Sequence, residues 1–134
     1  MKKDIHPPLV EDIAVAVVKE EDPKAETVWN VYLLNLKKET IEGVLVTSKG
    51  YGNVKGEDVK TSVLRHFLDT IPGKGFAKIE PIMENLFGIS NEYWVSFYLN
   101  KIMHDKKYVF LAESITEHNL ITIPLINKKG VMIK

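Results

Sequence analysis

The stretch Thr27-Val28-Trp29-Asn30-Val31-Tyr32-Leu33-Leu34-Asn35 decides the fold class of this chain, and Gly43-Val44-Leu45-Val46-Thr47-Ser48 repeats its pattern. β-Branched, aromatic and other apolar residues recur at every second position. This spacing puts alternate side chains on opposite faces of a β-sheet. The polar run 37–40 separates the two stretches. They therefore predict two β-strands joined by a turn, which we interpret as a hairpin.

Similar runs continue along the chain and extend this interpretation. Ile13–Lys19 is apolar at odd and even positions alike, as in a strand that is covered on both faces. Asp58–Ile71 fits both a helical stripe and an alternating strand, and its β-branched residues favour the strand. Ser48–Gly56 holds three glycines and is predicted to be a loop. Further strands are predicted at 76–82, 92–100, 106–111, 120–125 and 131–134, the last four as two hairpins.

Seven or eight short strands, separated by turns that contain Gly and Pro, are typical of an all-β protein. The pattern predicts an antiparallel immunoglobulin-like β-sandwich, with a small barrel as the alternative. Residues 1–11 are predicted as an extended lead-in, 12–114 as the sandwich, and 115–134 as a C-terminal tail with a β-hairpin. Exchange of this tail between the two copies of a dimer is an alternative to its packing on its own sandwich.

The composition is that of one globular domain. The chain has 134 residues, of which 45% are hydrophobic and 27% charged, enough for a single domain with its own core. Eighteen basic residues balance eighteen acidic ones, whereas proteins that bind nucleic acid usually carry a basic excess. The charge balance therefore argues against a nucleic-acid partner. No apolar run is long enough for a secretory leader or a membrane span, so we expect a cytoplasmic protein without membrane contact.

Motifs that would mark an enzyme or a metal site are missing from the sequence. There is no cysteine, so disulfides and thiolate chemistry are excluded. The glycine clusters lack the spacing of phosphate-binding loops, and no serine lies in a G-x-S-x-G motif. We therefore predict no cofactor, no metal and no enzymatic activity.

The histidines provide the one alternative with catalytic chemistry. No two of the four histidines are spaced as metal ligands on one helix or one strand. Chemistry at these residues would require His66 and His104, which are far apart in the chain, to meet in the fold. An enzyme with this composite site is the second alternative to the functional prediction given below.

One aromatic strand provides a candidate binding surface. If Tyr93, Val95 and Phe97 face the core, alternation turns Trp94 and Tyr98 outward. Outward aromatic rings stack on bases or small molecules, or another chain covers them. Our tentative binding residues are Trp94, Tyr98, His66, Arg65 and His104.

The C-terminal tail is the candidate interface. It is apolar and lies beyond the last expected core strand, and exposed strand edges of this kind pair readily with another chain. Our tentative interface residues are Ile121, Ile123, Leu125, Val131 and Ile133.

Four runs, Trp29–Asn35, Thr61–His66, Asn91–Tyr98 and Lys128–Val131, resemble a group of small uncharacterised bacterial β-rich proteins. The resemblance covers nearly the whole chain. Because this group has no established function, the resemblance implies a β-rich fold and transfers no site residue.

These observations together favour interaction over catalysis. We predict a non-enzymatic protein-interaction or structural module that forms a homodimer or binds an unidentified protein partner. The zero net charge removes one barrier to self-association. The first alternative is a domain that binds a small molecule or a nucleic acid on the exposed aromatic sheet face.

Overall fold

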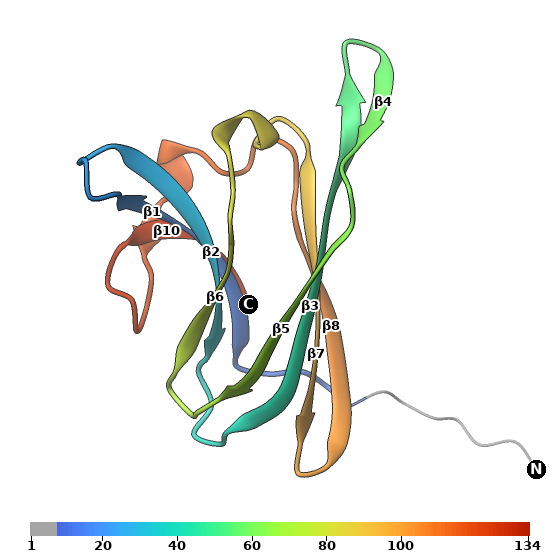
Figure 1. Ribbon diagram of the computed structural model, residues 1–134, viewed down its shortest axis with the longest axis vertical. Coiled ribbons are helices and arrows are strands. Elements are labelled where there is room, and N and C mark those ends of the chain that lie inside the picture. Colours follow the sequence, from blue (N-terminus) through green and yellow to red (C-terminus); the bar gives the residue numbers. More distant parts are fainter. Residues whose placement is uncertain (1–7) are drawn as a thin grey trace, which may run out of the picture.

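The computed structural model describes residues 8–134 and contains two antiparallel β-sheets that pack face to face (Figure 1). Sheet A holds, in spatial order, β6 (Phe76–Pro81), β2 (Thr27–Asn35), β1 (Ile13–Glu21), β10 (Lys129–Ile133) and β9 (Ile121–Thr122). Sheet B holds β4 (Glu57–Lys60), β3 (Ile41–Val54), β7 (Ser90–Leu99) and β8 (Ile102–Phe110), and β5 (Leu64–Ile71) pairs with β3. Two short 3₁₀ turns, η1 (Glu84–Leu86) and η2 (Glu117–Asn119), complete the described elements.

The prediction of an all-β chain with two antiparallel sheets is confirmed. The described residues form ten strands rather than seven or eight. The prediction of a covered strand at the start of the chain is also confirmed, because Ile13 to Val18 of β1 have almost no exposed surface. Hydrogen bonding of β1 to β2 on one side and to β10 on the other makes it the central strand of sheet A.

The main core lies between the two sheets. Its largest fully buried side chains are the aromatic rings of β7 and β8. Tyr93 and Phe110 meet edge to face, with ring centroids 6.1 Å apart, an arrangement that aromatic pairs prefer. The Tyr108 hydroxyl donates a 2.6 Å hydrogen bond to the Ile13 carbonyl. This bond fastens β8 of sheet B to the start of β1 in sheet A.

The predicted hairpin at 27–48 is wrong, because its two strands belong to different sheets. β2 pairs with β1 and β6, whereas β3 pairs with β4, β5 and β7. The buried side chain of Asn35 organises the corner between them: its amide donates to the carbonyls of Glu39, Ile71 and Pro72, and its oxygen accepts from the Lys37 amide. Alternation is the same in a hairpin and in such a crossing, so the pattern alone does not distinguish them.

The predicted loop at Ser48–Gly56 is also wrong, since β3 continues to Val54 and turns only at Lys55 and Gly56. A Cβ atom at Gly50 or at Gly52 would lie 3.0–3.1 Å from the side chain of Ile89. These glycines therefore permit close packing rather than a turn. The β3–β4 hairpin extends beyond the rest of the sandwich (Figure 1). The contested segment Asp58–Ile71 lies mainly in strands, as predicted.

Candidate functional site

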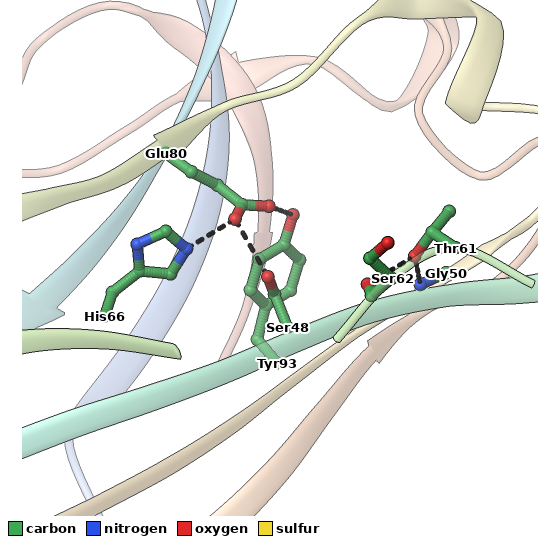
Figure 2. A network of polar contacts seen from close by, with 7 residues as sticks. All are labelled: Ser48, Gly50, Thr61, Ser62, His66, Glu80 and Tyr93. Carbon is green, nitrogen blue, oxygen red and sulfur yellow. Dashed lines mark hydrogen bonds and ion pairs between the residues drawn. The ribbon is translucent and has the colours of Figure 1, made fainter. Parts of the chain in front are cut away.

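The partly buried carboxylate of Glu80 connects the two sheets at the flank where β6 lies beside β5 (Figure 2). Glu80 extends from β6 of sheet A, and its three hydrogen-bond partners all belong to sheet B. Ser48 Oγ of β3 donates to Glu80 Oε1 at 2.8 Å, and His66 Nε2 of β5 lies 2.7 Å from the same oxygen. Tyr93 of β7 donates its hydroxyl to Glu80 Oε2 at 3.1 Å.

The surroundings of Glu80 shield its carboxylate from water and donate hydrogen bonds to it. Ser48 and Tyr93 are buried, and the Glu80 side chain is only 14% exposed. Burial, together with the charge of Glu80 and the hydrogen bond to it, raises the pKa of Tyr93 well above its usual range. The Tyr93 hydroxyl therefore stays protonated at neutral pH and remains a donor to the carboxylate.

Serine, histidine and glutamate meet here, but not in the order that nucleophilic catalysis requires. In a catalytic triad the histidine lies between the serine and the carboxylate, so that it can accept the serine proton. Ser48 and His66 instead both contact the same oxygen of Glu80. The arrangement holds a carboxylate in place and does not activate the serine.

A cleft of about 550 Å³ opens next to this network. On its other side, Figure 2 shows Gly50, Thr61 and Ser62, where the Thr61 hydroxyl accepts from the Gly50 amide and donates to the Ser62 carbonyl. The lining residues come from both sheets and from the β4–β5 connection. The cleft is therefore a product of the sandwich and not of any local motif. The remaining lining residues are Lys49, Leu64, Pro81, Leu86 and Asn91.

A second candidate site is the outer face of sheet B. Trp94 and Tyr98 point outward, as the alternation predicts, and each is 46% exposed. The register places Leu45 beside Phe67 and Tyr98 beside Met103, and these neighbours are exposed as well. Lys107 Nζ lies 5.3 Å from the centroid of the Trp94 ring. We call the group of Leu45, Phe67, Trp94, Tyr98 and Met103 the aromatic face.

The other predicted binding residues lie apart from one another. His66 belongs to the Glu80 network, whereas Arg65 next to it in β5 is exposed. His104 stacks on Phe97 with ring centroids 5.2 Å apart. Strands β3 and β7 lie between β5 and β8, so the fold does not bring His66 and His104 together. Within residues 8–134, no three His, Asp or Glu side chains gather in a way that could hold a metal ion.

The predicted interface residues of the tail are mostly occupied within the same chain. Ile123 is fully buried against the outer side of β1, and Leu125 packs beside it. Val131 and Ile133 of β10 pack against the main core. Of these five residues only Ile121 is exposed. Residues 115–134, expected as a separate tail, thus contribute two strands to sheet A.

The sequence pattern does not indicate Glu80 as a site residue, and a β-bulge explains why. Lys78 lies opposite Tyr32, and Glu80 lies opposite Val31, the neighbour of Tyr32 in β2. Two steps along β6 therefore match one step along β2, and Ile79 is the inserted residue. A bulge of this kind redirects the following side chains. Strict alternation would turn Glu80 outward with Lys78, whereas the bulge turns it toward sheet B. The sequence carries no signal for this insertion.

Searches of family models, curated proteins and solved structures found no match to this chain. The resemblance to a bacterial group stays a prediction. No helix among residues 8–134 combines the length and apolar character that crossing a membrane requires.

Proposed function

We propose that this protein is a non-enzymatic interaction module that forms a homodimer through the outer face of sheet B. The observation that carries the proposal is the aromatic face, whose exposed side chains come from four adjacent strands. Phe67 is 67% exposed, and Trp94 and Tyr98 are each nearly half exposed. Contiguous exposed apolar groups usually mark an interaction site. Tryptophan and tyrosine are also the residue types that contribute most to binding energy at interfaces.

Charged residues around the aromatic face suit a second copy of the same chain. Lys49 and Lys107 lie toward one end of the strands, and Glu42 and Asp105 lie toward the other. We place the two-fold axis in the interface plane and perpendicular to the strands. Each strand then lies antiparallel to the same strand of the partner and directly over it. Lys107 then lies against the partner's Asp105, and Lys49 lies toward the partner's Glu42, each contact occurring twice. Within its own copy, Glu92 lies 3.8 Å from Lys49 and 4.0 Å from Lys107 and partly balances their charge. The face is thus complementary to itself in apolar character and, where Lys107 meets Asp105, in charge.

We assign the sandwich to the immunoglobulin-like class on the basis of its strand pairing. β1, β2 and β6 share sheet A, in the positions of strands A, B and E of that class. β3, β7 and β8 share sheet B, in the positions of strands C, F and G. β4 and β5, which pair with β3, and β9 and β10 are additions to these six strands. Location in the cytoplasm stays a prediction from the sequence.

Analytical ultracentrifugation of the full chain tests the homodimer. We expect a monomer–dimer equilibrium in which Trp94→Ala raises the dissociation constant by about thirtyfold or more, as for a central aromatic anchor. Ile121→Ala is the matched control, because Ile121 is a similarly exposed apolar residue outside the aromatic face. A strict monomer at all concentrations, or equal effects of the two substitutions, contradicts the proposal.

A charge exchange tests the orientation of the two copies. Lys107→Asp and Asp105→Lys should each weaken the dimer, because each brings like charges together across the two-fold axis. The double variant restores opposite charges, and we expect it to regain most of the affinity. If the double variant is as weak as the single ones, the two copies are not arranged in this way.

A further inference from the structure

The cleft beside Glu80 carries more hydrogen-bond acceptors than its own residues use. Glu80 Oε1 already contacts both Ser48 and His66, whereas among residues 8–134 Oε2 accepts only from Tyr93. A carboxylate oxygen has two lone pairs, so Oε2 can accept a second donor. Glu80 lines the cleft, and its side chain keeps 14% of its surface exposed.

Asn91 adds a second unused acceptor. Its side chain is buried, and its amide group donates to the carbonyls of Leu86 at 2.8 Å and Ile89 at 3.1 Å. These two bonds fix the orientation of the amide and direct its oxygen toward Gly50, since a Cβ atom at Gly50 would lie 3.2 Å from Asn91 Oδ1. Among residues 8–134 no group donates a hydrogen bond to this oxygen.

The basic side chains of the cleft leave Glu80 Oε2 without a cationic partner among residues 8–134. His66 contacts Oε1 at 2.7 Å and not Oε2. Within the same residues Lys49 is the one lysine or arginine that lines the cleft, and its ammonium group lies on the opposite face of sheet B, 3.8 Å from Glu92. The walls beyond the polar groups include Leu64, Pro81 and Leu86. The cleft therefore combines one carboxylate, an amide oxygen and an apolar wall. This combination favours a ligand that donates hydrogen bonds, carries a positive charge and has a short apolar part.

We propose that this cleft binds a small molecule with a primary ammonium group. An ammonium group has three donors and no acceptor, which matches the surplus of acceptors on Glu80 and Asn91. Its charge compensates the partly buried carboxylate, and its alkyl chain packs against the leucines. A carboxylate ligand would be repelled by Glu80, and a neutral alcohol would lack the charge interaction. This site lies between the sheets and is independent of the aromatic face.

The probe is n-butylammonium chloride, titrated into the full ¹⁵N-labelled chain at constant ionic strength and followed by two-dimensional NMR. We expect saturable shifts of the Gly50, Ser62 and Asn91 amides with a dissociation constant in the millimolar range, as is usual for a ligand of this size. Butyrate and n-butanol, which match the chain length without the positive charge, should give no saturable shift. Absence of saturation with n-butylammonium, or equal affinity for n-butanol, overturns the proposal.

Variants locate the binding at Glu80. Glu80→Gln removes the charge and should weaken n-butylammonium binding at least tenfold. Glu20→Gln is the matched control, because Glu20 is a similarly shielded glutamate on the other side of sheet A, and its removal should leave the affinity unchanged. If Glu80→Gln does not fold, Ser62→Phe serves instead, since it fills the mouth of the cleft at an exposed position and leaves Glu80 intact. Binding that survives Ser62→Phe contradicts the assignment.

Discussion

The outer faces of the two sheets both carry apolar side chains, but only one of them is covered. On sheet A, Ala14, Ala16 and Val18 of β1 form a buried cluster beneath Ile123 of the C-terminal segment. On sheet B, the aromatic face is exposed, and no segment of residues 8–134 buries it. The same chain therefore supplies a cover for one sheet and leaves the other open.

The side chains on the covered face of sheet A are small, whereas those on the exposed face of sheet B are large. Alanines on β1 leave room for the C-terminal segment to approach the sheet closely, so a short stretch such as 123–126 completes the packing. Phe67, Trp94 and Tyr98 on sheet B are large and surrounded by charged residues, as at the centre of an interface with a polar rim. Size and exposure together thus distinguish internal packing from a surface for a partner.

The largest expected difference between the faces comes from placing a lysine at the centre of each. Ala16→Lys buries a charge beneath Ile123, and we expect it to reduce the free energy of unfolding by about 4 kcal/mol or more. Ser96→Lys puts the same side chain on the aromatic face, opposite Asp105, and should change the stability of the monomer by less than about 0.5 kcal/mol. Urea denaturation, at protein concentrations too low for the dimer to form, measures the free energy of unfolding of both variants. Equal losses would mean that both faces are covered.

A smaller difference is expected from truncating one large side chain on each face. Ile123→Ala removes buried methyl groups and should cost about 2–5 kcal/mol of stability. Phe67→Ala removes a larger side chain, but one that is 67% exposed, and should cost less than about 1 kcal/mol in the monomer. For self-association the order of the two effects is reversed, because only Phe67→Ala weakens the dimer. Thermal unfolding combined with sedimentation separates the two effects, and weaker self-association of Ile123→Ala would contradict this division.

Alternation predicted the part of the fold that depends on local side-chain direction. The strand class, the burial of β1 on both faces and the outward position of Trp94 and Tyr98 all follow from a period of two along a pleated strand. Strand pairing depends on segments that are far apart in the chain, and alternation does not predict it. The corner at Asn35 sends the chain from sheet A to sheet B through hydrogen bonds to Ile71 and Pro72, which lie 36 and 37 residues away.

The candidate site was less predictable than the fold for the same reason. His66 was selected from the sequence, but its partner Glu80 became visible only in the structure. The bulge at Ile79 turns Glu80 inward, and the two sheets then bring it to Ser48 and Tyr93. One inserted residue changes the direction of every side chain after it. A site that depends on such an insertion has no periodic signal in the sequence.

The smallest of these differences concerns a tyrosine–glutamate pair that each outer face carries. Tyr32 donates to Glu20 at 2.7 Å on sheet A, and Tyr51 donates to Glu92 at 3.0 Å on sheet B. Glu20 also accepts from Asn30 and Lys128. We expect Tyr32→Phe to cost about 1.5 kcal/mol at neutral pH and Tyr51→Phe about 0.5 kcal/mol, since the Tyr32 bond is the shorter one and the Tyr32 ring packs against the buried cluster that contains Ile123. Urea denaturation of both variants checks the order.

The pH dependence of the Tyr32→Phe cost sharpens this test. Burial, followed by the bond to Glu20, raises the pKa of Tyr32 to about 12. The stability contributed by Tyr32 is therefore complete below pH 10 and is lost as the pH rises toward 12. Burial acts to raise the pKa of Glu20, but hydrogen bonds from Lys128, Asn30 and Tyr32 outweigh it and lower the pKa below its ordinary value of 4.5.

The stability contributed by Glu20 is accordingly present above pH 4.5 and is lost as the pH falls through the lowered pKa. The cost of Tyr32→Phe should thus be greatest between pH 4.5 and pH 10 and shrink on either side of this range. Protonation of Glu20 weakens the bond by removing the acceptor's charge, and ionisation of Tyr32 removes the donor. Denaturation of the wild type and Tyr32→Phe across the pH range measures this difference. A cost that stays constant down to pH 2 would show that the bond to the Glu20 carboxylate does not contribute to the stability of sheet A.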